Sequence, residues 1–359
     1  MQNCSSFYRL RTRASNTFKP WLFKLHQNWR FIVKITLIKG DGIGPEVSGS
    51  TRSIIDAALE LHSDLKIDWE VFNIVDGQLS EALFKSLETN KVAIKGPITT
   101  PIGFGFKSIN VFLRQKYNLY ANVRPIKKII PTRYDESIDL VIFRENTEGL
   151  YAGIEHVISE DHIVAEKVTT RSASMKIATA AFEHALKLNA SKITVVHKAN
   201  ILKQCDGLFL ETVRAVAKKY PTVELVEMIV DNTAMQMVMK PSQFGIIVTT
   251  NLYGDILSDL AAGLIGGLGL APSANIGEDM AIFEPVHGSA PDIAGQNLAN
   301  PTACILSGVL MLEHLGEMKA AQAITQAITA VLDHADTRTK DLGGTLTTSE
   351  FTDAVIKRL

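Results

Sequence analysis

The residues whose spacing most suggests chemistry are two aspartates near the start of an expected helix. The segment Asn251–Asp259 follows an apolar, strand-like run at 244–249. Asp255 and Asp259 are four residues apart, so on a helix their carboxylates lie on one face, one turn apart. Two carboxylates at that distance repel each other unless a cation lies between them, and oxygen ligands favour Mg²⁺ or Mn²⁺. The alternative is a solvated helix start, where acidic residues interact favourably with the helix dipole.

Three arginines stand where a polyanionic ligand could be bound. Arg114 ends an expected helix, Arg124 precedes a proline, and Arg144 ends an expected strand. Ser108 and Asn110 lie about one helical turn before Arg114. A planar guanidinium group can bind a carboxylate through two parallel hydrogen bonds. A single arginine is usually solvated, but three at the edges of elements indicate a cradle for carboxylates.

Segments that must position these residues alternate between strand-like and helical patterns, which predicts an α/β fold. A glycine-rich turn, Gly40–Glu46, links the first strand to the first helix but is not Gly-x-Gly-x-x-Gly, so the Rossmann fingerprint is absent. The loop Gly96–Pro101 follows a short buried strand, at the sheet edge where α/β proteins bind ligands. A hairpin is expected within 150–170, a capping box from Thr347 to Glu350, and a polar loop over Phe283–Pro301.

Composition limits the classes of function. The chain has 359 residues, 46% of them hydrophobic and 21% charged, as in an ordinary globular enzyme of two domains. No apolar run approaches the roughly 18–20 residues that span a bilayer, so no membrane role is expected. Three cysteines provide no disulfide framework, which fits a reducing compartment.

Charge is distributed unevenly along the chain. Residues 1–33 contain six of the 37 basic residues and no acidic one, so the rest of the chain has 31 basic against 38 acidic residues. An acidic body argues against a nucleic-acid partner. The leader, residues 1–32, has the composition of a transit peptide, which would place the protein in the mitochondrial matrix. Alternatively the native chain starts near Val33, and a bacterial protein would then be cytoplasmic.

Six motifs together resemble the isocitrate/isopropylmalate dehydrogenase family, with a pattern nearest to the NAD-dependent isocitrate dehydrogenases. The resemblance covers about Lys34 to Leu359. It implies a large discontinuous domain (33–119 and 267–359), a smaller domain (120–266), and a homodimer or higher homo-oligomer in which the 150–170 hairpin joins subunits and active sites are shared. The motifs are Gly40–Glu46, Ser108–Arg114, Arg144–Tyr151, His197–Asn200, Asn251–Asp259 and His287–Asp292.

The resemblance also implies a role for individual residues. Tyr151 and Lys198 would be the acid–base pair. The metal would be held by Asp255 and Asp259 with Asp231 from a neighbouring subunit. The carboxylates of a tricarboxylate substrate would be bound by Ser108, Asn110, Arg114, Arg124, Arg144 and Asn200. The cofactor would lie against Ile43, Thr99, Thr100, His287, Gly288, Ser289, Ala290, Pro291, Asp292, Ile293 and Asn300.

The implied activity is oxidation of isocitrate by NAD⁺, followed by loss of CO₂ to give 2-oxoglutarate. The metal would acidify the substrate hydroxyl, Lys198 would accept its proton, and Tyr151 would protonate the enolate carbon. Asp292 indicates NAD, because a carboxylate repels a 2′-phosphate and accepts hydrogen bonds from ribose hydroxyls; Lys340 is a mild counter-indication. The alternatives are 3-isopropylmalate, homoisocitrate or tartrate- and malate-type substrates, or a regulatory subunit of a hetero-oligomer.

Overall fold

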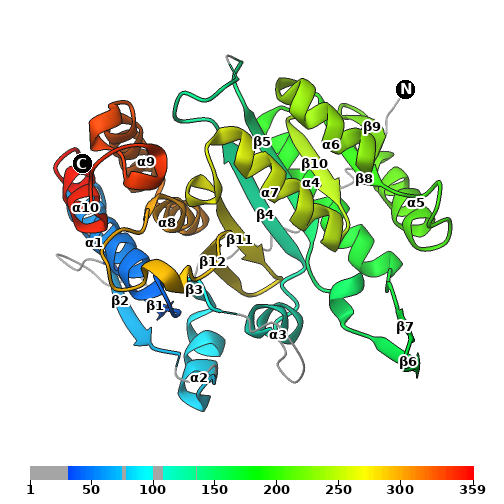
Figure 1. Ribbon diagram of the computed structural model, residues 1–359, viewed down its shortest axis with the longest axis horizontal. Coiled ribbons are helices and arrows are strands. Elements are labelled where there is room, and N and C mark those ends of the chain that lie inside the picture. The colour runs from blue at the N-terminus through cyan, green and yellow to red at the C-terminus, as the bar shows by residue number, and fades with distance from the viewer. Residues whose placement is uncertain (1–30, 75–77, 100–107, 135) are drawn as a thin grey trace, which may run out of the picture.

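A ten-stranded sheet extends through the computed structural model, which describes residues 31–74, 78–99, 108–134 and 136–359 (Figure 1). The strand order is β2-β1-β3-β12-β11-β4-β5-β10-β8-β9. The strands are β1 (Phe31–Ile38), β2 (Leu65–Phe72), β3 (Val92–Lys95), β4 (Ala121–Lys127), β5 (Asp139–Glu145), β8 (Lys192–His197), β9 (Glu224–Ile229), β10 (Ile246–Thr249), β11 (Pro272–Ile276) and β12 (Ala281–Pro285).

The sheet changes direction at its centre. Strands β2, β1, β3 and β12 are mutually parallel, and so are β5, β10, β8 and β9. Between these two groups, β11 runs antiparallel to β12 and to β4, and β4 runs antiparallel to β5. The five strands from β2 to β11 come from residues 31–95 and 272–285, and the other five from residues 121–249.

Helices pack against both halves of the sheet and on one another. Beside β1, a cluster is formed by α1 (Gly44–His62), α8 (Thr302–His314), α9 (Met318–Leu332) and α10 (Thr348–Ile356) (Figure 1). Beside β5 and β8 lie α4 (Arg171–Leu188) and α5 (Cys205–Ala217), and α6 (Val230–Met239) contacts α7 (Asn251–Ile265). The remaining helices are α2 (Glu81–Asn90) and α3 (Ile109–Lys116).

Apolar side chains on the inner faces of these helices supply the core. Ile54, Leu312, Ile324 and Phe351 are fully buried in one cluster, and burial of such a side chain stabilises the fold by about 1.5–3 kcal/mol. The predicted capping box is confirmed at the start of α10, where the Thr347 side chain and Glu350 each bond the other's backbone.

The predicted hairpin is present as β6 (Glu155–Ser159) and β7 (His162–Ala165), which pair only with each other and project from the body (Figure 1). Every residue of both strands is exposed, including Val157 at 75%, Ile158 at 61% and Ile163 at 60%. An isolated two-stranded hairpin is marginally stable in water, and exposed aliphatic patches mark contact surfaces. The hairpin therefore presents several aliphatic side chains to solvent.

Two strands contradict the sequence-based expectation. The segment Phe283–Pro301 was expected to be a polar loop, yet Ala281–Pro285 is β12, fully buried between β3 and β11. Its neighbour β11 was not expected either, because it begins at Pro272 and carries Ser273 and Asn275. These polar residues are buried and hydrogen-bonded across the sheet, so tertiary partners override a composition typical of loops.

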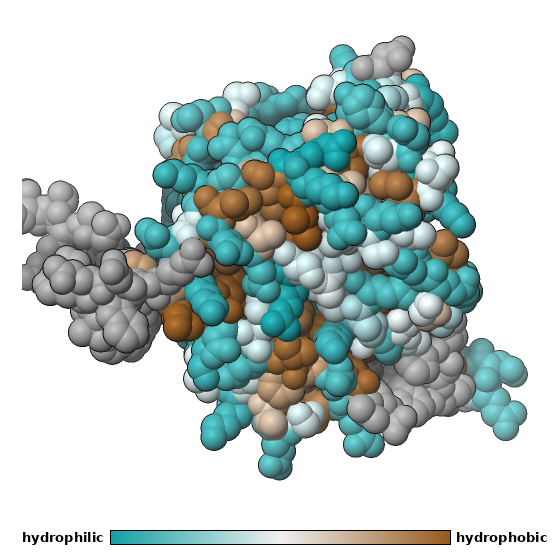
Figure 2. Space-filling view, turned by 90° about the vertical axis from the view of Figure 1, so that its left-hand side faces the viewer, coloured by the Kyte–Doolittle hydropathy of each residue, from teal (hydrophilic) through white to brown (hydrophobic). Residues whose placement is uncertain are grey.

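Hydrophilic side chains cover most of the face shown in Figure 2, and apolar side chains form separate patches on it. In the part of the chain that the structure describes, no helix has the length and apolar character to cross a membrane.

Candidate active site

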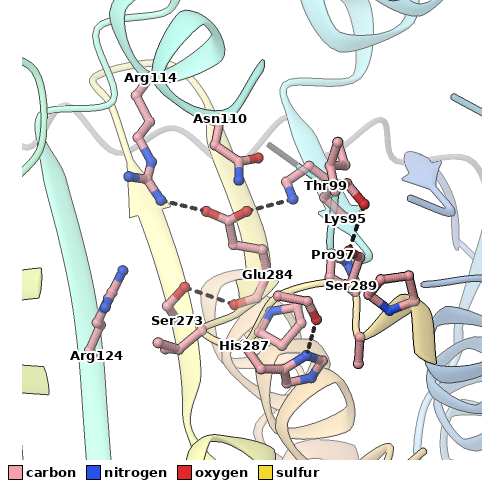
Figure 3. Close-up of a pocket in the computed structure, with 16 residues that line it drawn as sticks. Lys95, Pro97, Thr99, Asn110, Arg114, Arg124, Ser273, Glu284, His287 and Ser289 are labelled. Atoms are coloured by element: carbon pink, nitrogen blue, oxygen red, sulfur yellow. Dashed lines mark hydrogen bonds and ion pairs between the residues drawn. The ribbon is translucent and has the colours of Figure 1, made fainter. Parts of the chain in front are cut away.

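A cavity of about 440 Å³ opens at the centre of the sheet (Figure 3). Its wall is formed by the ends of β3 and β12, by α3, β4 and β11, and by the loop 286–291. Arg114, Arg124 and Asn110, all predicted to bind substrate, line it, as do Thr99 and the predicted cofactor residues His287–Pro291. Parallel strands present their following loops at one sheet edge, which is why loops after β3 and β12 meet here.

A buried carboxylate that sequence reasoning did not single out lies in this wall. Glu284 accepts hydrogen bonds from Lys95 Nζ at 2.6 Å and from Arg114 Nη2 at 3.0 Å (Figure 3). Burial raises the pKa of Glu284, but the ion pairs with Lys95 and Arg114 outweigh it and hold this pKa far below its usual range. Lys95 is 2% exposed and Glu284 4%. No sequence signal marks the pair, because Lys95 and Glu284 are brought together only by the pairing of the distant strands β3 and β12.

The two aspartates of the predicted metal site lie close to two of the predicted substrate arginines. Asp255 and Asp259 both lie on α7, as expected. Asp255 accepts hydrogen bonds from Arg144 Nη1 and, at 2.5 Å, from Tyr151 Oη. Arg124 Nη1 lies 3.2 Å from Asp255 and 3.7 Å from Asp259. Burial raises the pKa of Asp255, but Arg144 and Arg124 outweigh this and lower it, whereas burial raises the pKa of Asp259.

Arg144, which donates to Asp255, is also fixed by two further contacts. Its Nε and Nη2 atoms donate to Asn251 Oδ1 at 3.0 and 2.7 Å, and its guanidinium lies 4.9 Å from the centre of the Tyr151 ring. Burial and the neighbouring arginines lower the pKa of Arg144 to about 9, so it stays charged at neutral pH. A Cβ atom on Gly254 would lie 2.6 Å from Arg144 Cγ, so glycine is required there for α7 to approach β5.

Lys198 and Asp231 form a second group. Lys198 Nζ donates to Asp231 Oδ1 at 2.7 Å, and no contact joins this pair to Asp255 among the described residues. Asp206, which sequence reasoning missed, anchors the loop that carries Lys198. The backbone N–H of Lys198 donates to the fully buried side chain of Asp206 at 2.7 Å. Asp206 also accepts from Lys167, at the base of the hairpin. Asn200 is exposed and does not line the cavity.

The glycine-rich turn after β1 reaches the predicted cofactor loop. Ile43 N donates to Ser289 O at 2.8 Å, and a Cβ atom on Gly42, at φ +56°, would lie 2.1 Å from that oxygen. Thr99 Oγ1 bonds Ser289 Oγ at 2.6 Å and donates to Asp41 at 2.7 Å. The structure thus brings Ile43, Thr99 and Ser289 together as predicted, whereas Thr100 lies outside the described residues.

The rest of the cofactor set lies along the same loop. Ile293 packs with Ile43 in a small apolar cluster, Asp292 is exposed, and Asn300 Nδ2 donates to Asp341 at 3.0 Å. Two buried polar atoms of the cavity, His287 Nε2 and Asn110 Oδ1, have no hydrogen-bond partner among the described residues. Burial lowers the pKa of His287, which keeps it neutral. Unpaired buried atoms of this kind suit a polar ligand.

The donor set of Asp255 and Asp259 also suits a hard cation. Carboxylate oxygens are the ligands that Mg²⁺ and Mn²⁺ prefer, and the Asp259 side chain is 55% exposed and so accessible to an ion. No three His, Cys, Asp or Glu side chains gather into a metal-binding group within the described ranges. Mg²⁺ keeps several water ligands and is usually bound through one or two carboxylates, so the pair Asp255 and Asp259 is compatible with such an ion.

The sheet that reverses direction beside an arginine-lined cavity makes this an α/β protein, and its sequence lacks the Rossmann fingerprint. The chain belongs to the isocitrate/isopropylmalate dehydrogenase family, whose model matches residues 34–355. This match confirms the resemblance and the predicted fold class.

Individual relatives are similar over nearly the whole chain. A catalytic subunit of the mitochondrial NAD isocitrate dehydrogenase of Arabidopsis thaliana is 48% identical over 337 residues, 91% of this chain and 88% of the relative. A regulatory subunit of the mitochondrial NAD isocitrate dehydrogenase of Dictyostelium discoideum is 46% identical over 363 residues, 100% of this chain and 97% of the relative. The crystal structure of isocitrate dehydrogenase from Methylococcus capsulatus is 47% identical with a TM-score of 0.86, covering 91% of this chain and 99% of that one.

Proposed function

We propose that the chain catalyses the NAD-dependent oxidative decarboxylation of isocitrate to 2-oxoglutarate and CO₂ with Mg²⁺ or Mn²⁺. The observation that carries this proposal is the convergence of Arg124, Arg144 and Tyr151 on Asp255, beside the cavity that Arg114 lines. Arginines bind carboxylates, the aspartates suit a divalent ion, and the tyrosine hydroxyl is a proton donor next to both.

The charge of the site favours a tricarboxylate. Four buried cations, Lys95 and the three arginines, face the carboxylates Glu284, Asp255 and Asp259, which leaves one net positive charge. A bound divalent ion would raise this to three, and the ion pair of Lys198 with Asp231 from a neighbouring subunit would add no net charge. The total matches the three negative charges of isocitrate. A dicarboxylate such as 3-isopropylmalate would leave one positive charge unbalanced in a buried site, which is costly.

Polar residues on α3 support the same choice. Asn110 lies in the cavity wall with a buried, unpaired Oδ1 atom, and Ser108 caps the helix with its hydroxyl 3.5 Å from Val111 N. An isopropyl group in the place of a carboxylate would leave the side-chain amide of Asn110 without a partner, at a cost of about 1–3 kcal/mol.

The chain's own residues have distinct proposed tasks. The metal would be held by Asp255, Asp259 and Asp231 of a neighbouring subunit, and when bound it would lower the pKa of the substrate hydroxyl and stabilise the enolate. Lys198 would accept the hydroxyl proton, and Tyr151 would donate a proton to the carbon that loses CO₂. Because Lys198 and Asp231 contact each other and not Asp255, we propose that both extend into the site of a neighbouring copy.

This sharing implies a homo-oligomer, with the exposed hairpin β6–β7 as a contact element. We also propose the two domains 33–119 with 267–359 and 120–266, because the strands divide between these segments. Residues 1–30 are proposed as a mitochondrial transit peptide, since the named relatives are mitochondrial. The boundary expected at residue 32 is two residues too late, because Phe31 and Ile32 belong to β1 and pair with β2. The oligomeric state is measured by sedimentation under assay conditions. A chain that sediments as a monomer and is still fully active would contradict the active site shared between subunits.

A regulatory role in a hetero-oligomer is the second candidate, favoured by the similarity to the Dictyostelium protein over the full chain. In that case the chain would bind ligands but turn over no substrate without a catalytic partner. The arginines, Tyr151, Lys198 and the three aspartates argue for catalysis, because each has the chemistry that the reaction requires.

The decisive assay measures NADH formation by the purified chain alone. With isocitrate and Mg²⁺ we expect turnover that stops in excess chelator, and at least about a hundredfold lower kcat/KM with 3-isopropylmalate. Homoisocitrate is included because it carries the same charge. Preference for 3-isopropylmalate would overturn the substrate, and no turnover with any of the three acids would favour the regulatory role.

Cofactor choice has its own test. Asp292→Lys combined with Ile293→Tyr should shift the ratio of kcat/KM for NADP⁺ over NAD⁺ upward by about tenfold or more, because a charge-assisted hydrogen bond to the 2′-phosphate replaces a repulsion. The control is Asp353→Lys, an equal change of charge at an exposed position on α10. An unchanged ratio in the double variant would refute the assignment of Asp292.

A further inference from the structure

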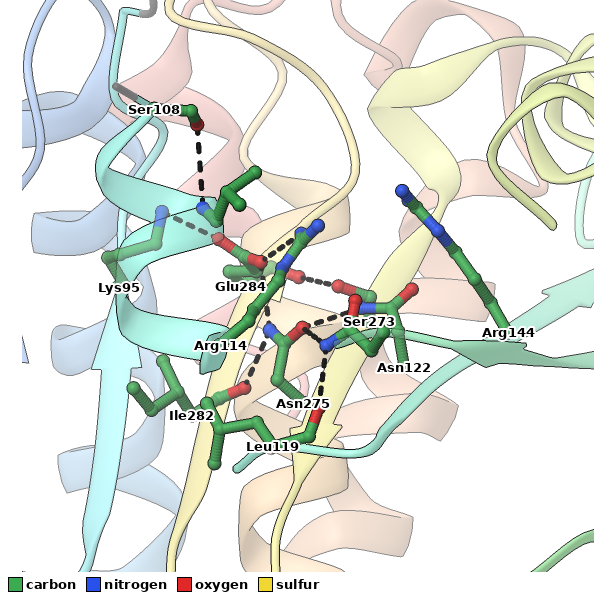
Figure 4. Close-up of polar contacts among 12 residues, drawn as sticks. Lys95, Ser108, Arg114, Leu119, Asn122, Arg144, Ser273, Asn275, Ile282 and Glu284 are labelled. Atoms are coloured by element: carbon green, nitrogen blue, oxygen red, sulfur yellow. Dashed lines mark hydrogen bonds and ion pairs between the residues drawn. The ribbon is translucent and has the colours of Figure 1, made fainter. Parts of the chain in front are cut away.

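A chain of buried hydrogen bonds joins Arg124 and Arg114, two arginines of the cavity, through two asparagines. Figure 4 shows the part of this chain that runs from Asn122 through Asn275 and Glu284 to Arg114. Arg124 Nε donates to Asn122 Oδ1 at 2.5 Å, and Asn122 Nδ2 donates to Asn275 Oδ1 at 2.8 Å. Asn275 Nδ2 then donates to Glu284 Oε1 at 2.8 Å, the oxygen that also accepts from Arg114 at 3.0 Å. The chain crosses the three central strands β4, β11 and β12.

The direction of these hydrogen bonds is determined by the groups at the two ends. A guanidinium can only donate and a carboxylate can only accept, so each asparagine amide between Arg124 and Glu284 has one permitted orientation. Asn275 Oδ1 accepts a second bond, from Asn146 Nδ2 at 2.9 Å, and its Nδ2 also donates to Ile282 O at 3.2 Å. Every polar atom of the Asn275 side chain is thus used, in one arrangement.

Burial makes this arrangement rigid. Asn122 is 0% exposed and Asn275 2%, so water does not compete for their hydrogen bonds. Arg114 and Arg124 carry like charges and repel each other; burial lowers the pKa of Arg124, and Arg114 lowers it further. Arg124 is held against that repulsion in part by Asp255, 3.2 Å from its Nη1 atom, and by Ser258, whose hydroxyl accepts a hydrogen bond at 2.6 Å. Glu284 binds Arg114, and Asn275 and Asn122 connect Glu284 to Arg124 through hydrogen bonds.

We propose that Asn275 is a positioning residue that fixes the spacing of Arg114 and Arg124, and thereby the separation of the substrate carboxylates that the cavity accepts. This inference rests on the proposed function. Asn275 has no polar atom left to bind a ligand, so it acts only through the arginines. Loss of Asn275 therefore weakens the binding of the acid rather than the proton transfers, which Lys198 and Tyr151 perform on other segments.

The experiment compares Asn275→Asp and Asn275→Ser with the wild type. An aspartate has nearly the same shape but cannot donate to Glu284, and serine is a milder change that leaves room for water. We expect KM for isocitrate to rise about tenfold or more in the Asp variant and less in the Ser variant. In both, kcat should stay within about threefold and KM for NAD⁺ within about twofold.

Thr352→Val is the matched structural control, because it removes a buried hydrogen bond, to Ser50 Oγ, between α10 and α1. It should lower Tm without changing KM for isocitrate. A loss of kcat and Tm in both Asn275 variants with unchanged KM would overturn the inference, since it indicates a purely structural role. An inactive wild type would instead count against the proposed function, on which the inference depends.

Discussion

Asp255→Asn is expected to lower kcat/KM for isocitrate by about a thousandfold or more. Asp255 contacts Arg124, Arg144 and Tyr151, and it is proposed to bind the metal as well. An asparagine keeps the shape but removes the charge, so the affinity for a divalent ion falls. It also leaves Arg124 and Arg144 facing each other without their shared counterion.

The measurement is kcat/KM over a titration with Mg²⁺, together with direct binding of Mn²⁺ followed by electron paramagnetic resonance. The metal affinity of the variant should fall in both experiments. Asp353→Asn, an exposed residue of α10, is the control and should change neither quantity. Unchanged Mn²⁺ binding by Asp255→Asn would show that the carboxylate serves only to pair the arginines.

Lys198→Met is expected to lower kcat by about 10²–10⁴-fold, the range found for loss of a general base. Stability should change little, because the side chain of Asp231, which loses its partner, is 70% exposed and stays hydrated. Lys198→Arg separates two explanations. It keeps the positive charge but cannot accept a proton at neutral pH, so it should be about as inactive as the methionine variant.

A partial reaction makes this test sharper. Decarboxylation of the β-keto acid intermediate, supplied directly as oxalosuccinate, needs no proton acceptor for the hydroxyl, so Lys198→Met should retain it. Tyr151→Phe should lose it, because the proton donor to carbon is missing. If Lys198→Met lost both reactions equally, the lysine would be needed for binding or assembly and not as a base.

Much of the site could be predicted because its residues lie in long motifs with strong local signals. The spacing of Asp255 and Asp259 places both on one helix face wherever that helix lies, and α7 confirms this. Helix start signals such as Thr347 with Glu350 act within four residues and are read directly from the chain. The family match supports the remaining roles as proposals.

What could not be predicted depends on partners distant in sequence. Glu284 lies in a segment that looked like a polar loop, and only the pairing of β12 with β3 and β11 places it between Lys95 and Arg114. A buried lysine gives no local signal, because its environment comes from another strand. Asp206 was missed for the same reason, since its role consists of contacts with Lys167 and the Lys198 loop.

The central place of β12 also has a consequence for biosynthesis. Lys95 is buried at the end of β3, but its counterion Glu284 lies on a strand made near the end of the chain, and Arg114 and Glu284 are 170 residues apart. Until the ribosome has released β12, Lys95 and Arg114 lack that anion and must stay hydrated, because a buried unpaired cation is strongly unfavourable. The ligand cavity is therefore completed late, when β11 and β12 enter between β3 and β4 and connect the two groups of strands into one sheet.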